Sequence, residues 1–401
     1  MEVLRRPGDR HDRTSPVRKL RHVAVLVETD DSWGCSVIRG IADFAGKHGG
    51  WNLLIDPRDH EQRPALPERW SGDGIIARIS SRLQVEQILE KSLPTVNVDS
   101  MFEDLPGVGT VVTDEVERAR MALSHLLDRG FTQFAYFAPP DRRYSHDRGD
   151  AFLTEVEMAG YTHWDYRPGY RAGRKISWDE QQRRVSRWLA SLPKPIAVLA
   201  VDAQRARQLT EICFVSKVRV PDDVAILAGE SNELMCDVST PPLSSILEAS
   251  QRIGHDSAEL LNRIMDGEAP PNSPIRIPPI GVIGRQSTDI LSIDDENIVN
   301  ALRLIQSRAT QGLVVDDILY EVPVSRRSLE IRFRRYLGRS PAEEIRRVRL
   351  EKSKDLLARS EMSIAEVASA CGFANATRFG VAFRKRHGMT PLAYRKTFKT
   401  G

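Results

Sequence analysis

Seven residues in the first three quarters of the chain have polar or aromatic side chains that can bind a ligand. Each lies near the carboxyl end of a predicted strand, and together they are Asp30, Trp33, Arg78, Asp114, Arg148, Asp202 and Glu230. Carboxylates accept hydrogen bonds from sugar hydroxyls, arginine donates them, and an indole ring packs against the apolar face of a pyranose. We therefore expect an effector site for a small sugar. For Asp114 or Asp202 alone, a helix N-cap or a surface salt bridge is the competing interpretation.

The elements that must position these residues are short apolar runs that alternate with helix-sized segments. Such runs predict strands buried on both faces, at residues 22–28, 51–56, 71–79, 94–99, 107–114, 131–138, 195–202 and 224–230. Strands that alternate with helices of about a dozen residues indicate parallel sheets covered by helices, and ligands bind at the carboxyl ends of such strands. The α/β region spans about 265 residues, which favours two similar lobes over one doubly wound sheet.

A second group of residues, near the C-terminus, has the pattern of two short helices joined by a tight turn. A predicted helix over 364–370 is followed by a break at Gly372 and by a basic helix that starts near Asn375. Phe379 and Phe383 lie four residues apart on the inner face of that second helix. A helix, a tight glycine-containing turn and a basic helix are the outline of a helix-turn-helix unit. A plain helical hairpin is the competing interpretation for one copy.

The same pattern occurs twice. Phe333-Arg334-Arg335 before Gly338 matches Phe383-Arg384-Lys385 before Gly388 at an offset of 50 residues. The first halves of the two copies match at an offset of 49, so their turns differ by one residue. An internal repeat predicts the same supersecondary unit built twice, at about 315–336 and 364–387.

The charge of the chain is divided between its two parts. The whole chain has a formal net charge of +3, but residues 301–401 carry +11 and the remaining residues carry −8. This division predicts a polyanionic partner for the C-terminal part. Membrane lipid is the competing polyanion, and we discount it because the basic helices carry a buried apolar face and belong to a repeat.

Several classes of protein are disfavoured by what the sequence lacks. No apolar run reaches the ~18 residues of a membrane span, and the N-terminus has no apolar signal core. The four cysteines are scattered, without a CxxC pair, so neither a disulfide framework nor a metal site is expected. Phosphate-loop, nucleophile-elbow and HExxH patterns are absent. We therefore expect no enzyme, no catalytic residue, no cofactor and no membrane partner.

Two parts of the chain resemble known families. Residues 296–400 look like an AraC-type double helix-turn-helix domain, on the motif Ile364-Ala365-x-Val367-Ala368-x-x-Cys371-Gly372-Phe373, then Phe379-x-x-x-Phe383-Arg384-Lys385 and Gly388-x-Thr390-Pro391. Residues 21–285 look like a LacI-type, periplasmic-binding-protein-like sensor. Residues 286–295 are then the linker, and residues 1–20 a disordered basic tail.

The resemblance implies a transcription regulator of the bacterial cytoplasm, associated with the nucleoid, that binds double-stranded DNA and controls sugar-catabolism genes. The order of sensor and AraC-type domain is similar to that of bacterial sugar-operon regulators and implies D-xylose or a related monosaccharide as effector. A homodimer is expected, and RNA polymerase is a further candidate partner. The chain departs from the family at Glu230, where the shorter aspartate is usual.

The helix-turn-helix outline assigns roles to ten residues. Ser325 is the expected N-cap of the first recognition helix. The residues expected to face base edges are Arg326, Arg327, Glu330, Asn375, Thr377 and Arg378. Those expected to hold phosphates, which gives affinity rather than sequence reading, include Arg334, Arg384 and Lys385. A different possibility is a sugar-binding module whose basic tail binds nucleic acid without sequence preference.

Overall fold

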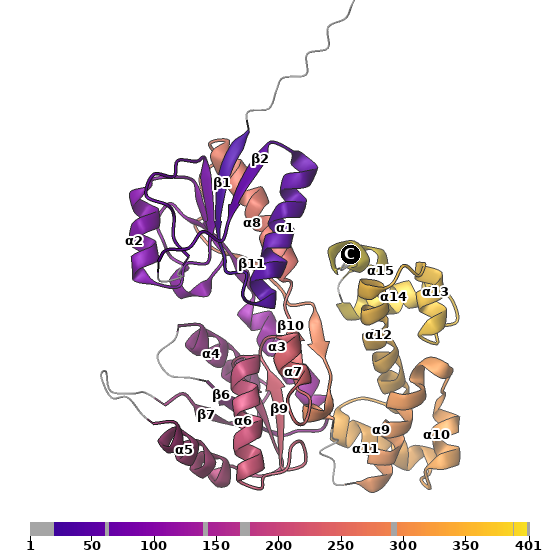
Figure 1. Cartoon of the computed structure of the whole chain (residues 1–401). Helices are drawn as coiled ribbons and strands as arrows, with labels where there is room; N and C mark the ends of the chain where they lie inside the picture. Colours follow the sequence, from indigo (N-terminus) through magenta and orange to yellow (C-terminus); the bar gives the residue numbers. More distant parts are fainter. Residues whose placement is uncertain are drawn as a thin grey trace, which may run out of the picture. The chain divides into compact units, whose positions relative to one another are not determined.

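The computed structural model describes residues 20–60, 64–138, 143–168, 177–289, 295–387 and 389–398. The disordered tail expected over residues 1–20 therefore lies outside the described residues, except for residue 20. The chain divides into two compact units (Figure 1). Unit 1 consists of residues 1–111 and 253–275, and unit 2 consists of residues 112–252 and 276–401.

The first sheet, most of which belongs to unit 1, has six strands in the order β11-β5-β4-β3-β1-β2, and β5 and β11 cross the boundary between the two units. Their bounds are β1 Arg21–Leu26, β2 Trp51–Ile55, β3 Gly74–Ala77, β4 Thr95–Asn97, β5 Gly109–Thr113 and β11 Ile275–Ile277. Helices α1 (Ser32–His48) and α8 (Ser250–Met265) cover one face, and α2 (Arg82–Glu90) covers the other (Figure 1). Helices α1 and α8 touch at Gly254, where an added Cβ would lie 1.9 Å from the carbonyl oxygen of Val37.

Unit 2 contains a second six-stranded sheet, in the order β12-β10-β9-β8-β6-β7. Its strands are β6 Gln133–Phe137, β7 Thr162–Tyr166, β8 Ile196–Ala200, β9 Val224–Ala228, β10 Ser244–Leu247 and β12 Gly281–Ile283. Strand β12 runs antiparallel to β10, whereas β6, β7, β8, β9 and β10 pair in parallel. Two largely parallel sheets confirm the predicted α/β sensor with two similar parts.

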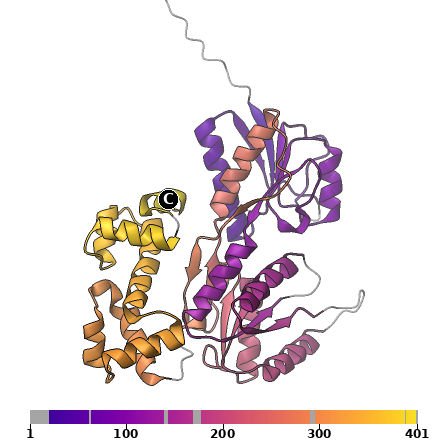
Figure 2. The same cartoon turned by 180° about the vertical axis from the view of Figure 1, so that it is seen from behind.

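Alternate residues of the second sheet face two layers of helices. Ile196 and Val198 pack with α5 (Trp178–Ser191) and α6 (Ala203–Val215). Ala197 and Leu199 between them pack with α3 (Glu115–Leu127) and α4 (Arg143–Met158), which lie side by side (Figure 2). Because both of its faces are covered, β8 is apolar without interruption, which is why the sequence reveals it.

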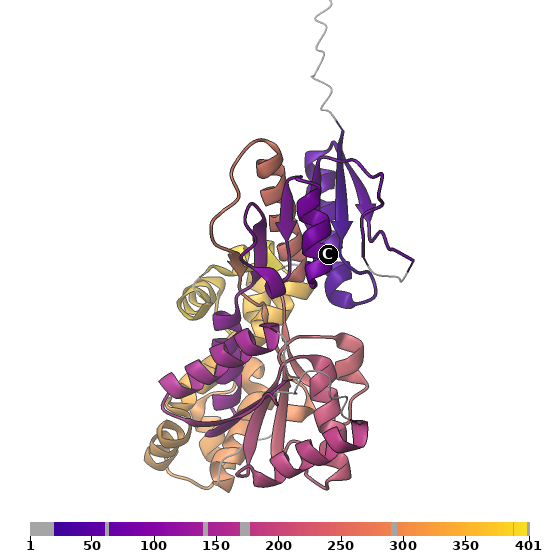
Figure 3. The same cartoon turned by 90° about the vertical axis from the view of Figure 1, so that its left-hand side faces the viewer.

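The last hundred residues are helical and are drawn orange to yellow in Figures 1, 2 and 3. Their helices are α9 Glu296–Arg308, α10 Val315–Glu321, α11 Arg326–Leu337, α12 Pro341–Arg359, α13 Ile364–Ala370, α14 Ala376–His387 and α15 Pro391–Phe398. Four residues separate α10 from α11 and five separate α13 from α14, which confirms the one-residue difference between the two turns.

Local chemistry explains why the second helix-turn-helix has these bounds. Ser363 accepts a hydrogen bond from the backbone of Glu366, whose carboxylate reaches back to the Ser363 N–H, so α13 starts with a capping box. After α13 the chain turns at Gly372, whose φ of +76° favours glycine and where an added Cβ would lie 3.0 Å from the Thr310 carbonyl oxygen. Phe379 and Phe383 are fully buried.

Some predicted bounds need correction. Residues 286–288, expected to begin the linker, form a 3₁₀ turn in which Ser287 and Thr288 are buried. Ser287 Oγ donates to the Ile226 carbonyl oxygen over 2.6 Å, so this turn belongs to the second sheet's packing. Residues 290–294 of the expected linker lie outside the described residues. Within the described part of the chain, no helix is both long and apolar enough to cross a membrane.

Candidate functional site

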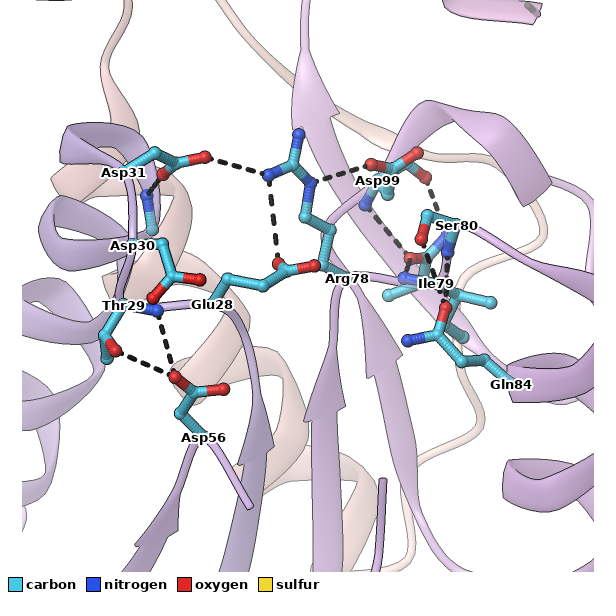
Figure 4. A network of polar contacts seen from close by, with 12 residues as sticks. Glu28, Thr29, Asp30, Asp31, Asp56, Arg78, Ile79, Ser80, Gln84 and Asp99 are labelled. Carbon is cyan, nitrogen blue, oxygen red and sulfur yellow. Dashed lines mark hydrogen bonds and ion pairs between the residues drawn. The ribbon is translucent and has the colours of Figure 1, made fainter. Parts of the chain in front are cut away.

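Charged side chains gather at the carboxyl ends of the unit 1 strands, with Arg78 at their centre (Figure 4). The first strand-end cluster consists of Glu28, Asp30, Asp31, Asp56, Arg58, Arg78 and Asp99. Arg78 Nη1 lies 3.2 Å from an Asp31 carboxylate oxygen, and its Nε lies 3.2 Å from Asp99. The guanidinium also stacks over the Trp33 ring, 4.7 Å from the ring centroid. The structure thus brings two predicted effector residues, Trp33 and Arg78, into contact.

A neighbouring arginine holds the third predicted effector residue of unit 1. Arg58 donates to both carboxylate oxygens of Asp30, over 3.0 and 2.9 Å, and lies 2.7 Å from Asp56. Burial works to raise the pKa of Asp56, but hydrogen bonds from Arg58 and Thr29 outweigh it and lower the pKa. Burial likewise opposes the charge of Arg78, yet Asp99, Glu28 and Asp31 raise its pKa. The surroundings therefore favour the charged forms of Asp56 and Arg78, and the cluster has more carboxylates than guanidinium groups.

Unit 2 has its own group of charges at its strand ends. The second strand-end cluster consists of Glu115, Arg118, Arg148, Asp202, Glu230 and Glu248. Arg118 Nε lies 2.9 Å from Glu115, and its Nη2 pairs with Glu248. Arg148 lies 3.1 Å from Glu115 and 3.4 Å from Glu230, and donates to the Val201 carbonyl oxygen. Two arginines thus join helices α3 and α4 to three strand ends.

The carboxylates of the second cluster differ in their affinity for protons. Burial works to raise the pKa of Glu115, but Arg118 and Arg148 outweigh it and lower the pKa. For Glu230, burial and the charges of Glu248 and Asp202 outweigh the two arginines and raise the pKa to about 7. A protonated Glu230 can donate a hydrogen bond as well as accept one. Donors and acceptors of both kinds are what a polyol requires.

Two other predicted effector residues cap helices. Asp114 accepts hydrogen bonds from the Val116 and Glu117 amides over 3.0 and 3.1 Å, at the start of α3. Asp202 accepts one from the Arg205 amide over 2.6 Å, at the start of α6. Both aspartates therefore have the N-cap role that was the competing interpretation. A carboxylate has about four lone-pair sites, so a cap leaves acceptor capacity for a ligand.

Sequence reasoning missed three members of the second cluster: Glu115, Arg118 and Glu248. Glu115 directly follows the predicted Asp114, and Arg118 lies one helical turn later on the same face. This spacing was a usable signal. Glu248 directly follows strand β10, which the apolar pattern does not reveal because its sequence begins with two serines.

The two recognition helices, α11 and α14, each expose a basic face. Ser325 caps α11 and accepts a hydrogen bond from the Ser328 amide over 3.2 Å, as predicted. Arg327, Arg334 and Arg335 are exposed, whereas Glu330 is half-buried. Arg326 is exposed too, but it pairs with Asp316 of α10. Binding DNA through Arg326 would compete with that ion pair.

In the second helix-turn-helix, Asn375 caps α14 and accepts a hydrogen bond from the Arg378 amide over 2.9 Å. The exposed residues on this helix include Thr377, Arg378, Arg384 and Lys385. In each helix-turn-helix, the predicted DNA-contacting residues therefore lie on the recognition helix or directly before it. Their contacts with DNA stay predictions.

Helix α3 runs from the second cluster to a contact with the C-terminal helical segment. The cluster, the helix and the segment all belong to unit 2. Its C-cap residue, Asp128, is buried and lies 2.8 Å from both Arg339 and Arg347. Arg347 in turn lies 2.7 Å from Glu344. Burial raises the pKa of Asp128 even though Arg347 and Arg339 lower it. A single helix of thirteen residues, about 20 Å long, therefore has the strand-end cluster at one end and this ion-pair junction at the other.

Family models match both parts of the chain. A periplasmic binding protein-like domain matches residues 123–288, and a helix-turn-helix domain matches residues 320–397. The xylose operon regulatory protein of Escherichia coli (strain K12) is 30% identical over 385 residues, which covers 94% of this chain and 97% of that protein. Its counterpart in Haemophilus influenzae is 29% identical, covering 93% and 97%.

A solved structure supports the same relationship. The structure of the xylose-binding transcription activator xylR matches with a TM-score of 0.59 and 28% identity, over 95% of this chain and 99% of that one. A LacI family transcriptional regulator from Mycobacterium smegmatis matches with a TM-score of 0.52 over 67% of this chain. At 18% identity, the second likeness shows the fold alone.

Proposed function

We propose that this chain, which belongs to the family of the xylose operon regulatory proteins, binds a specific DNA sequence with an affinity that a monosaccharide changes. The observation that carries the proposal is one chain with two polar strand-end clusters and two recognition helices with basic faces. The sugar we propose is D-xylose or a related monosaccharide, and the target genes are those of sugar catabolism. The protein would act in the bacterial cytoplasm.

The DNA-binding half of the proposal follows from helix geometry. Each recognition helix would enter a major groove, and α12 would set the two on successive turns of one face, roughly 34 Å apart. Arg327, Thr377 and Arg378 would face base edges, whereas Arg334, Arg384 and Lys385 would hold phosphates. A homodimer would then present four recognition helices.

The sugar-binding half follows from the charge of the clusters. Both clusters have more carboxylates than arginines, and the arginines are already paired with them. Such sites attract hydroxyl hydrogens and repel anions, so the effector we propose is a neutral sugar rather than a sugar phosphate or a sugar acid. The longer side chain of Glu230 narrows the space available in the second cluster.

The link between the two halves would be helix α3. A sugar that hydrogen-bonds to Glu115, or that displaces Arg118 or Arg148 from it, would change the ion pairs that hold the start of α3. Asp128 at its other end holds Arg339 and Arg347 of the helical segment. A sugar can alter DNA binding only if its affinity for the DNA-competent conformation differs from its affinity for the conformation that does not bind DNA.

Footprinting on DNA from upstream of the chain's own gene tests the DNA-binding half. A homodimer with two half-sites of two turns each should protect a discrete stretch of about 30–40 base pairs. If the protection has no boundary, and unrelated DNA is protected at the same protein concentration, the result would instead favour a sugar-binding module with a non-specific basic tail.

A further inference from the structure

Two exposed apolar side chains lie within the basic faces of the recognition helices. Ile331 of α11 is 57% exposed and Val381 of α14 is 67% exposed. Each is the sixth residue of its helix, and the two are separated by the same 50 residues as the repeat. The two recognition helices therefore carry a β-branched apolar residue at the same structural position.

Helical spacing places each of these residues at the centre of the outward face. Arg327 precedes Ile331 by four residues, and Arg334 and Arg335 follow it by three and four. On an α-helix, residues three or four apart are neighbours on one face. Ile331 is thus surrounded by three cations on the exposed side of α11, opposite the buried Leu329 and Phe333.

The surroundings of Val381 are equivalent. Thr377 lies four residues before it, and Arg384 and Lys385 lie three and four residues after it. Phe379 and Phe383 fill the opposite, buried face. A single exposed apolar residue is common on protein surfaces. Here two exposed apolar residues occupy the same structural position, and basic or hydroxyl side chains surround each of them. This arrangement favours a ligand with an apolar group at its centre and negative charges on either side.

DNA offers this combination in the major groove. The phosphates flank the groove, and the C5-methyl group of thymine is the apolar feature on its floor. We propose that Ile331 and Val381 each contact a thymine methyl group, so that each helix-turn-helix unit reads at least one thymine by apolar contact. This inference rests on the proposed function and adds specificity-determining residues to those that the sequence predicted.

The test removes only the methyl group. Each thymine within the protected stretch is replaced in turn by deoxyuridine, which keeps the hydrogen-bonding edge unchanged, and the dissociation constant is measured for the full chain. Burying one methyl group corresponds to about a four-fold change in affinity, so we expect at least one deoxyuridine position per half-site to weaken binding by about that factor. In Ile331→Ala or Val381→Ala, one of those positions should lose its effect.

Val215→Ala is the matched control, because Val215 lies on a helix of the sensor part and is 69% exposed. This variant should keep the wild-type response to every deoxyuridine. The inference is overturned if a discrete footprint exists but no deoxyuridine weakens wild-type binding, or if Ile331→Ala and Val381→Ala respond as wild type does. Failure of the proposed function looks different, because then no discrete footprint appears with any variant. Thermal unfolding at the wild-type temperature establishes that the two exposed-site variants fold.

Discussion

The two strand-end clusters use the same kinds of side chain but differ in the burial of their central arginines. Arg78, at the centre of the first cluster, has a side chain that is 33% exposed. In the second cluster Arg118 is 1% exposed and Arg148 is 6% exposed. Water screens the charge of Arg78, whereas the charges of Arg118 and Arg148 depend on their carboxylate partners. Rearrangement around a ligand should therefore cost less in the first cluster than in the second, whose buried ion pairs hold the start of helix α3.

Stability should reveal this difference most strongly. Arg118→Met removes a buried cation and leaves Glu115 and Glu248 without it, which should cost about 3–5 kcal/mol. Arg78→Met removes a partly exposed cation whose pairs should contribute no more than about 1 kcal/mol. Thermal unfolding of both variants at pH 7 measures the two losses side by side. Equal losses would contradict this distinction between the two clusters.

In the proposed link, Asp128 at the end of helix α3 joins the second cluster to the DNA-binding segment. Asp128→Asn removes the charge that holds Arg339 and Arg347 but keeps the shape of the side chain. Coupling energies between two sites are typically about 1–3 kcal/mol, so we expect the sugar-induced change in DNA affinity to shrink several-fold in this variant. Sugar affinity itself should stay within about two-fold of wild type.

The matched control for that experiment is Asp56→Asn, which alters the first cluster and leaves the α3 junction intact. Sugar affinity can fall in this variant, but DNA affinity at saturating sugar should still change as it does in wild type. If Asp128→Asn responds to sugar as fully as wild type does, the route through α3 is refuted.

The pH dependence of stability should have opposite signs in the two clusters. The pKa of Glu230 in the folded chain is about 7, above its ordinary value of 4.5, so the folded state binds more protons between these values. Its contribution to the free energy of unfolding therefore falls as pH rises from about 4.5 to 7. The pKa of Asp56 is lowered from 3.8, so its contribution is present above that value and is lost as pH falls through the folded pKa.

Thermal unfolding between about pH 2 and 8 checks both signs, because the Asp56 contribution is lost only below its ordinary pKa of 3.8. Glu230→Gln should flatten the profile between pH 4.5 and 7, and Asp56→Asn should leave that part unchanged. The Glu230 effect should be the smallest of those predicted, because its side chain is 40% exposed and water screens its interactions with Glu248, Asp202, Arg148 and Arg118. A Glu230→Gln profile that matches wild type would mean that Glu230 is ionised in the folded chain.

The helix-turn-helix units were predictable almost to the residue, because their signals are local. Ser363 with Glu366, the turn at Gly372 and the spacing of Phe379 and Phe383 act within one or two helical turns. The buried strands were predictable for a similar reason, since continuous apolar runs mark them. Strands β7, β10, β11 and β12 were missed because they are edge-like, rich in polar residues or only three residues long.

The pairings within the clusters could not be predicted from the sequence. Arg118 reaches Glu248 across 130 residues, and Arg148 reaches Glu230 across 82. Residue type and strand-end position predicted that polar groups would gather, and they do. Which carboxylate holds which arginine depends on sheet order, and that order depends on contacts far apart in the chain. For the same reason the junction between Asp128, Arg339 and Arg347 had no sequence signal.

The most direct test of the central claim is the affinity of the full chain for its footprinted DNA, measured with and without saturating D-xylose. We predict a change of at least about five-fold, the lower end of typical allosteric coupling, with a neutral pentose effective and its phosphate ester ineffective. An affinity and a footprint that are the same for every pentose and hexose tried would contradict the account.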